Sequence, residues 1–257
     1  MARKPKLAVF KFSSCGGCQL ALLDLEEELL EISDAVRIAY FMEASRAELP
    51  APYDIALVEG AVSTPHEADL IKEIRKKSKF LVAIGACATA GGIQALRNWK
   101  DVKEFLEIVY PTPEFIQALD KAAPLSDFVK VDYELRGCPV NRHQVLELLN
   151  AYLNNRRPNI PPHSLCIECK IKGNICIMVA EGIPCLGPVT QAGCGAICPS
   201  YGRGCYGCFG PMESPNPESL AAYFEKMRIM RDEIGRMFRE FTGWSKPFKE
   251  VSEKYEE

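Results

Sequence analysis

The sequence predicts an α/β protein, with a flavodoxin-like, doubly wound parallel sheet followed by an irregular, cysteine-rich domain that ends in a helix. Two observations predict this. Over residues 1–160, short apolar runs alternate with amphipathic segments, which is typical of parallel strands buried between helices. Over residues 161–211, that alternation stops and eight of the twelve cysteines appear. We therefore predict two domains, 1–160 and 161–257, with Pro158, Pro161 and Pro162 marking the boundary.

Each predicted strand is a short apolar run that suits a buried position in a parallel sheet. The five predicted strands are Leu7–Phe12, Val36–Phe41, Ile55–Val58, Phe80–Ile84 and Phe128–Val131.

Three helices are predicted to connect and close this sheet. Gln19–Glu31 carries leucines at 22, 25 and 29 with glutamates between them, which is an amphipathic pattern. The next helix begins after Ser63 and Thr64, has Pro65 in its first turn and extends to Lys77. Asn141–Leu153 closes the domain.

The second domain has different physical properties. Residues 161–211 contain only five charged residues and keep no strand or helix period for long. Because such a segment has little regular apolar surface to bury, we expect bound metal to help order it. Pro217–Phe241 then has near-helical apolar spacing and predicts an amphipathic helix, whereas the charged tail Lys246–Glu257 is expected to be mobile.

Composition excludes several classes of protein. The 257 residues are 47% apolar and 25% charged, which excludes wholesale disorder. Lys plus Arg number 31 against 34 Asp plus Glu, a net charge of −3, so no basic excess favours nucleic acid or an anionic membrane. Glycines and prolines interrupt the longest uncharged stretch, Gly182–Gly202, so it does not predict a spanning helix. No secretion leader is visible, so the sequence predicts a cytoplasmic protein.

Twelve cysteines point to metal, because a cytosol keeps thiols reduced. Cys15 and Cys18 follow the first predicted strand, Cys87 the fourth and Cys138 the fifth. The carboxyl ends of parallel strands share one edge of a sheet, so these four thiols are expected to converge. Four thiolates suit a tetrahedral zinc ion or a [4Fe-4S] cluster, and a redox dithiol at Cys15 and Cys18 is the less favoured alternative.

The other eight cysteines form two groups of four, and each group contains one Cys-x-x-Cys pair. The groups are Cys166, Cys169, Cys176 and Cys185, and then Cys194, Cys198, Cys205 and Cys208. Spacing alone is compatible with structural zinc or with iron–sulfur clusters. A third group of four in the same chain favours clusters, since a row of them conducts electrons.

Several motifs resemble the small subunits of [NiFe]-hydrogenases, over about residues 5–210. They are Ser13-Ser14-Cys15-Gly16-Gly17-Cys18-Gln19-Leu20, Glu59-Gly60-Ala61-Val62, Gly85-Ala86-Cys87-Ala88, Gly137-Cys138-Pro139, Pro184-Cys185-Leu186-Gly187-Pro188 and Cys205-Tyr206-Gly207-Cys208. The chain is most similar to the cytoplasmic group that includes the delta subunits of archaeal sulfhydrogenases and NAD(P)-linked hydrogenases. The Cys15-Gly-Gly-Cys18 spacing differs from the adjacent cysteines of the respiratory complex I relative, which argues against a quinone-reducing subunit.

The resemblance implies three [4Fe-4S] clusters with twelve cysteine ligands. The proximal ligands would be Cys15, Cys18, Cys87 and Cys138, the medial ones Cys194, Cys198, Cys205 and Cys208, and the distal ones Cys166, Cys169, Cys176 and Cys185. Exported relatives use a histidine as a distal ligand, but here four cysteines make His163 redundant, so we interpret it as a loop residue.

The implied function is electron transfer in a soluble hydrogenase complex, in which this chain holds no catalytic residue. The resemblance places a NiFe centre on a large-subunit partner, and FAD and NAD(P) on further flavin and iron–sulfur subunits, with reduction of sulfur as an additional family activity. Two alternatives stay open. One is a hydrogenase subunit that feeds a heterodisulfide reductase or a deazaflavin-linked partner, and the other is a zinc-bound structural scaffold.

Overall fold

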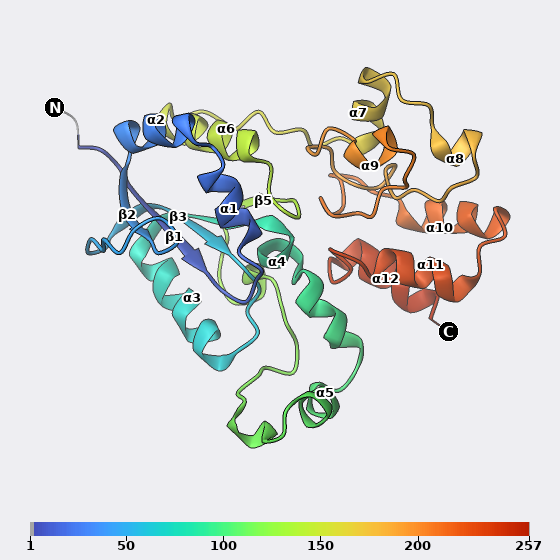
Figure 1. The fold of residues 1–257 in the computed structure, drawn as a ribbon, viewed down its shortest axis with the longest axis horizontal. Coiled ribbons are helices and arrows are strands. Elements are labelled where there is room, and N and C mark those ends of the chain that lie inside the picture. Colours follow the sequence, from blue (N-terminus) through green and yellow to red (C-terminus); the bar gives the residue numbers. More distant parts are fainter. Residues whose placement is uncertain (1–2, 257) are drawn as a thin grey trace. The chain divides into compact units, whose positions relative to one another are not determined.

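A computed structural model describes residues 3–256 of the chain. The chain divides into two compact units, residues 1–142 and residues 143–257 (Figure 1). This division falls at the start of helix α6 (Arg142–Leu153). The predicted boundary at 160/161, which separates the first group of cysteines from the other eight, is a different division and stays a prediction.

The first unit is built on one parallel five-stranded sheet with strand order β2-β1-β3-β4-β5. The order reverses direction at β1, so helices cover both faces, and the predicted doubly wound, flavodoxin-like architecture is confirmed (Figure 1). The strands are β1 (Lys6–Lys11), β2 (Arg37–Phe41), β3 (Tyr53–Glu59), β4 (Ser78–Ile84) and β5 (Tyr133–Leu135).

The helices of this unit follow the strands in the alternation expected of such a sheet. They are α1 (Gly17–Leu23), α2 (Glu27–Ala35), α3 (Pro65–Lys77), α4 (Gly85–Ala90) and α5 (Val102–Val109), with short 3₁₀ segments at Ile93–Trp99, Pro113–Phe115 and Leu125–Asp127. Helix α3 begins as predicted. Thr64 accepts a hydrogen bond from the Glu67 amide, the Glu67 carboxylate accepts one from the Thr64 amide, and Pro65 occupies the first turn.

Two predicted elements of the first unit are wrong. The predicted strand Phe128–Val131 is a turn in which the amides of Phe128 and Val129 donate to the Leu125 carbonyl, and the fifth strand is Tyr133–Leu135 instead. The predicted helix Gln19–Glu31 is broken into α1 and α2, with Glu26 at a positive φ of 50°. Leu25 lies in the break between the two helices, and its side chain is only 1% exposed.

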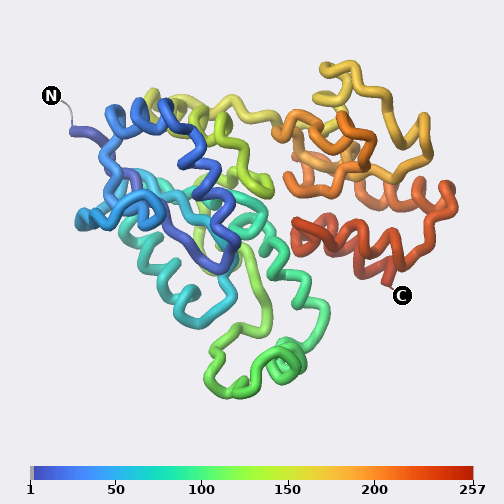
Figure 2. The backbone as a smooth tube through the Cα atoms, in the orientation of Figure 1, coloured from blue at the N-terminus to red at the C-terminus, as the bar shows by residue number. Residues whose placement is uncertain are grey.

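The second unit contains short helices around the cysteines and a cap of three helices. The short helices are α7 (Leu165–Ile171), α8 (Ile177–Ala180) and α9 (Ile197–Ser200), and the cap is α10 (Pro217–Lys226), α11 (Arg231–Phe238) and α12 (Lys246–Lys254). Figure 2 shows the C-terminal segment doubling back beside α10.

The cap corrects two further predictions. Residues 217–241 form two helices because Phe224 and Phe238 share one core, with ring centroids 6.5 Å apart. A continuous helix would separate these residues by about 21 Å, and the chain turns instead at Arg228, whose φ is 65°. The tail is a helix rather than a mobile segment, because Phe248 and Val251 are each 1% exposed within the same core.

Among the described residues, no helix is sufficiently long and apolar to cross a bilayer.

The aromatic core of the cap makes a quantitative prediction. Phe248 packs edge-on against Phe238 with centroids 5.6 Å apart, so Phe248→Ala should lower the free energy of unfolding by about 3–5 kcal/mol. Phe115→Ala is the matched control, because Phe115 is 78% exposed and its loss should change stability by less than about 0.5 kcal/mol. Chemical denaturation followed by circular dichroism measures both, and equal effects would show that Phe248 does not stabilise the cap.

Candidate metal centres

The first group of thiols lies at the carboxyl edge of the sheet. Cys15 and Cys18 follow β1, Cys87 lies in α4 directly after β4, and Cys138 follows β5. The charges of Cys87 and Cys138 act on Cys18, and that of Cys15 acts on both Cys87 and Cys138. The structure therefore brings together the four cysteines that the strand positions predicted to meet.

Hydrogen bonds between loops hold this arrangement. The Ala86 amide donates to the Gly137 carbonyl at 2.7 Å, which ties the start of α4 to the segment that carries Cys138. The Gln94 side chain donates to the Ser13 carbonyl at 2.5 Å and lies 3.5 Å from the Cys87 sulfur. These hydrogen bonds connect the segments that carry Cys15, Cys87 and Cys138 to one another.

Burial disfavours the charged thiolate form in three of the four thiols of this group. Burial, together with the nearby charges of Cys138 and Cys15, raises the pKa of Cys87 to about 11, although the hydrogen bond to Gln94 lowers it. Burial likewise raises the pKa values of Cys18 and Cys138. A bound metal would offset this cost, because it deprotonates its thiol ligands.

Glycine is required where the backbone touches these sulfurs. Gly85 has a φ of +84°, and a Cβ there would overlap the Sγ atom of Cys18. Gly92 has a φ of +64°, and its Cβ would lie 2.5 Å from the Sγ atom of Cys87. The close approach explains glycines directly after β4 and after α4.

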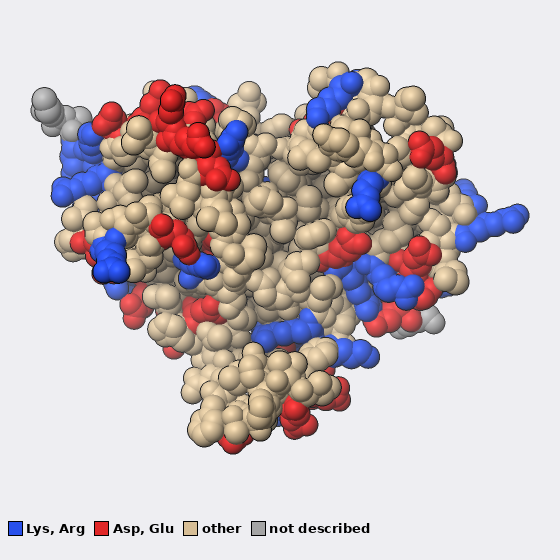
Figure 3. All heavy atoms as spheres, viewed as in Figure 1, with Lys and Arg blue, Asp and Glu red and all other residues tan. Residues whose placement is uncertain are grey.

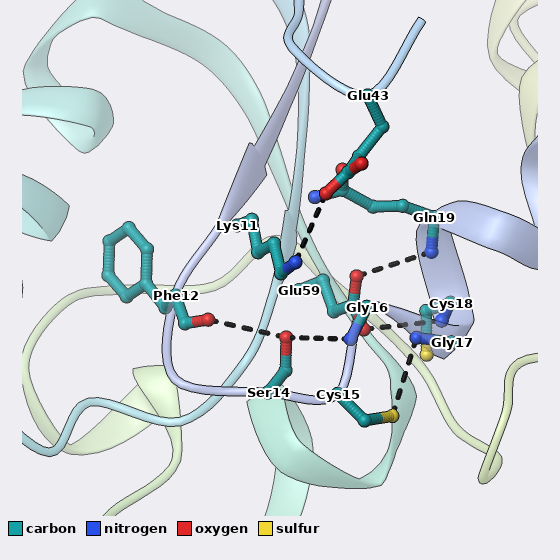
Figure 4. A network of polar contacts seen from close by, with 10 residues as sticks. All are labelled: Lys11, Phe12, Ser14, Cys15, Gly16, Gly17, Cys18, Gln19, Glu43 and Glu59. Carbon is teal, nitrogen blue, oxygen red and sulfur yellow. Dashed lines mark hydrogen bonds and ion pairs between the residues drawn. The ribbon is translucent and has the colours of Figure 1, made fainter.

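Glu59 is a buried carboxylate beside the first group (Figure 4). It ends β3, is 1% exposed, and accepts hydrogen bonds from the amides of Cys18 and Gln19, each at 3.2 Å. Burial raises its pKa, while these amides and the charge of Lys11 lower it. The motif around Glu59 carried the family resemblance, but the sequence reasoning missed this role. The signal was a carboxylate directly after the apolar run 55–58, where a charge is costly unless it is hydrogen-bonded.

The second group lies around α7 and α8. Cys166 and Cys169 belong to α7, Cys176 precedes α8, and Cys185 follows in a loop. Burial, together with the charges of Cys185, Cys169 and Cys176, raises the pKa of Cys166 to about 11. These four thiols lie near one another, and Cys169 and Cys185 also lie near Cys194 and Cys198 of the third group.

The third group adjoins the second within the same unit. Cys194 interacts with Cys198, and Cys205 with Cys208. The Cys205 amide donates to the Sγ atom of Cys185 at 3.2 Å, so the third group contacts the second directly.

His163 lies in the loop before α7, with its Nδ1 atom 3.2 Å from the Ser164 carbonyl oxygen. The side chains of Ser164 and Asn174 hydrogen-bond to the thiols of Cys166 and Cys169.

The chemistry of the donor sets fits iron–sulfur clusters, since each group supplies four thiols in a partly buried setting. No three His, Cys, Asp or Glu side chains within residues 3–256 are placed to hold a single metal ion.

Comparison with known proteins places the chain in a family. A family model described as the NADH ubiquinone oxidoreductase 20 Kd subunit matches residues 15–152. The chain belongs to this family. It is 36% identical to sulfhydrogenase 2 subunit delta of Pyrococcus furiosus, over 93% of this chain and 100% of that protein. It is also 36% identical to a subunit of the F420-non-reducing hydrogenase of Methanocaldococcus jannaschii, over 80% and 81% of the two chains.

A solved structure agrees with these relatives. A chain of the NAD⁺-reducing [NiFe]-hydrogenase in the H₂-reduced state superimposes with a TM-score of 0.58 and 29% identity, over 62% of this chain and 96% of that chain. The predicted resemblance to hydrogenase small subunits is thereby confirmed, and the relatives are subunits of oxidoreductase complexes.

The contact at Gly85 generates a prediction. Gly85→Ala should strain the backbone by about 1–3 kcal/mol and displace the Cys18 thiol, so the first group should lose its metal. Gly202→Ala is the matched control, because Gly202 has a φ of +67° with nothing within 4 Å of a Cβ. The Gly202→Ala variant has a similar backbone strain but no contact with a sulfur, so the first group should keep its metal in that variant.

Metal content per chain, measured by plasma mass spectrometry, distinguishes the two variants. Equal metal in both would show that the glycine contact does not position Cys18.

Proposed function

We propose that this chain is the electron-transfer subunit of a [NiFe]-hydrogenase, relaying electrons between a NiFe centre on a partner large subunit and a redox-active acceptor subunit. One observation carries the proposal. Twelve cysteines fall into three groups of four with none left over, and each group suits a [4Fe-4S] cluster. The relatives, named as hydrogenase subunits, support the same function.

In this proposal, Cys15, Cys18, Cys87 and Cys138 hold the proximal cluster, which exchanges electrons with the large subunit. Two features favour that partner at this edge. Cys15 is exposed although it belongs to the ligand set. Leu20 in α1 and Ile93 after α4 are 55% and 48% exposed, so apolar surface flanks the segments that carry the ligands and favours a protein partner over solvent.

The eight cysteines of the second unit hold the other two clusters, medial on Cys194, Cys198, Cys205 and Cys208, and distal on Cys166, Cys169, Cys176 and Cys185. The direct bond from the Cys205 amide to the Cys185 sulfur supports electron passage between these neighbours.

Backbone amides of this chain donate hydrogen bonds to sulfurs of the proximal and distal groups. Cys185 accepts from the amides of Gly187 and Cys205, at 3.4 and 3.2 Å, whereas the sulfur of Cys15 accepts from the Gly17 amide at 3.4 Å. Hydrogen bonds to sulfur, burial and net charge set cluster potentials. The bound clusters would supply one-electron transfer, and the protein would supply ligands, exclusion of water and these amide donors.

For the acceptor, we propose a flavin subunit that reduces NAD(P), in line with the name of the NAD⁺-reducing structure. The alternative is a chain that feeds a heterodisulfide reductase or a deazaflavin-linked partner, and the name F420-non-reducing hydrogenase, borne by another relative, specifies no acceptor. The subunit that co-purifies with this chain distinguishes these acceptors.

Metal analysis tests the proposal. The purified chain should contain about twelve irons and about twelve acid-labile sulfides if each group holds a cubane cluster. Two or three zinc ions with no sulfide would instead establish the zinc-bound scaffold and end the proposed electron transfer.

A second prediction tests the third group. Cys198→Ala should leave Cys194, Cys205 and Cys208 holding a [3Fe-4S] cluster, because removing one thiolate frees one iron and leaves three ligands. The oxidised variant should then show a three-iron signal by electron paramagnetic resonance, at about one spin per chain.

Ser200→Ala is the control for this variant, since Ser200 lies in the same helix α9 and its hydroxyl contacts only the Ala196 carbonyl and the Asn174 side chain among the described bonds. An unchanged spectrum and iron content in Cys198→Ala would show that Cys198 is not a ligand.

A further inference from the structure

Exposed apolar side chains lie on both sides of Cys176 along the chain of the second unit. Ile171, Ile175 and Val179 are 79%, 76% and 77% exposed, whereas Ile177 between them is 5% exposed. Cys176 is itself exposed, while the other three thiols of its group are buried or half-buried. Ile177 is therefore buried in the core, whereas its apolar neighbours are exposed to solvent. They lie near Cys176, the most exposed thiol of its group.

This surface extends to helix α9. The Asn174 side chain donates to the Ser200 hydroxyl at 3.0 Å, which joins the loop between α7 and α8 to the end of α9. There Ile197 and Tyr201 are 57% and 81% exposed. We call these residues the isoleucine surface, which consists of Ile171, Ile175, Val179, Ile197 and Tyr201.

A groove adjoins the isoleucine surface at Val179. It has a volume of about 540 Å³, and Met178, Met212 and Tyr223 line it together with Val179. Methionines are adaptable and polarisable, and they are frequent where a protein surface accommodates an apolar side chain of a partner.

Charge is sparse here and mostly positive. Lys170, Lys172 and Arg203 are exposed beside the isoleucine surface, and Glu181 is the exposed acid on the segment that follows α8. Figure 3 shows mainly uncharged atoms over the region that Figure 1 labels α7 and α8, with isolated charges among them. An apolar centre with a basic rim complements a partner whose rim is acidic.

We propose that the isoleucine surface is the docking surface for the electron-accepting subunit, a redox-active protein whose contact face has an apolar centre and an acidic rim. This inference rests on the proposed function. An exposed ligand thiol is where an acceptor can approach the distal cluster most closely, and the apolar side chains around it exclude water once they are covered.

The test uses the complete complex, purified from the organism that makes it through a tag on this chain. Ile171→Asp and Tyr201→Asp each place a carboxylate in the apolar centre. We expect the amount of flavin- or iron–sulfur-bearing subunit retained per chain to fall about tenfold or more. Hydrogen-driven reduction through that subunit, divided by the rate with benzyl viologen, should fall by a similar factor, with iron per chain unchanged.

Met230→Asp is the matched control, because Met230 is 63% exposed and precedes α11 at its N-cap position, where aspartate is well tolerated. It should retain the subunit in full. If an aspartate variant loses iron, Ile171→Ser repeats the test without added charge, and a smaller loss of the subunit is expected.

Three outcomes would overturn the inference while leaving electron transfer intact. The first is full retention of the redox subunit in both variants. The second is loss only of self-association of this chain, and the third is loss only of binding to anionic phosphatidylglycerol vesicles. Absence of iron and sulfide from the wild-type complex would instead overturn the proposed function.

Discussion

The first unit depends on the convergence of four thiols that are far apart in the sequence. Cys15 and Cys138 are separated by most of the unit, yet both lie at the edge where parallel strands end. In a parallel sheet, each crossover returns the chain to the edge where the strands begin, so all strands end at the opposite edge. The cost is a crowded edge, in which the backbone at Gly85 passes so close to Cys18 that no side chain fits.

A buried carboxylate is part of the same edge. Glu59 ends the central strand β3 and is satisfied by the first amides of α1, the helix that carries Cys18. Its charge also acts on Cys18, Cys87 and Cys138, so the electrostatic surroundings of this thiol group include a fixed acidic group. Anionic surroundings and hydrogen bonds are among the ways a protein adjusts a bound cluster.

The second unit solves a different problem, since its cysteine segment has few regular elements. Its order comes from a compact aromatic core in which Phe224, Phe238 and Phe248 pack together beneath the thiol-bearing loops. Cys185 and Cys205 are members of that core. The family model ends at residue 152, before these loops, whereas the Pyrococcus furiosus relative matches 93% of the chain. The cysteine-bearing loops after residue 152 therefore lie outside the matched family model, whereas the alignment with this hydrogenase relative covers most of the chain.

The sequence by itself determined the parallel sheet, the start of α3 and the grouping of the cysteines at the sheet edge. These depend on local signals: apolar runs, a capping box with proline, and cysteines directly after strands. Only the tertiary structure decided where helices break, because the turn at Arg228 follows from the shared core of Phe224 and Phe238 and not from any local propensity. It also decided that the charged tail folds as α12, since burial of Phe248 and Val251 outweighs the polarity of their neighbours. The role of Glu59 emerged only there as well, because its partners are amides 40 and 41 residues away in the chain.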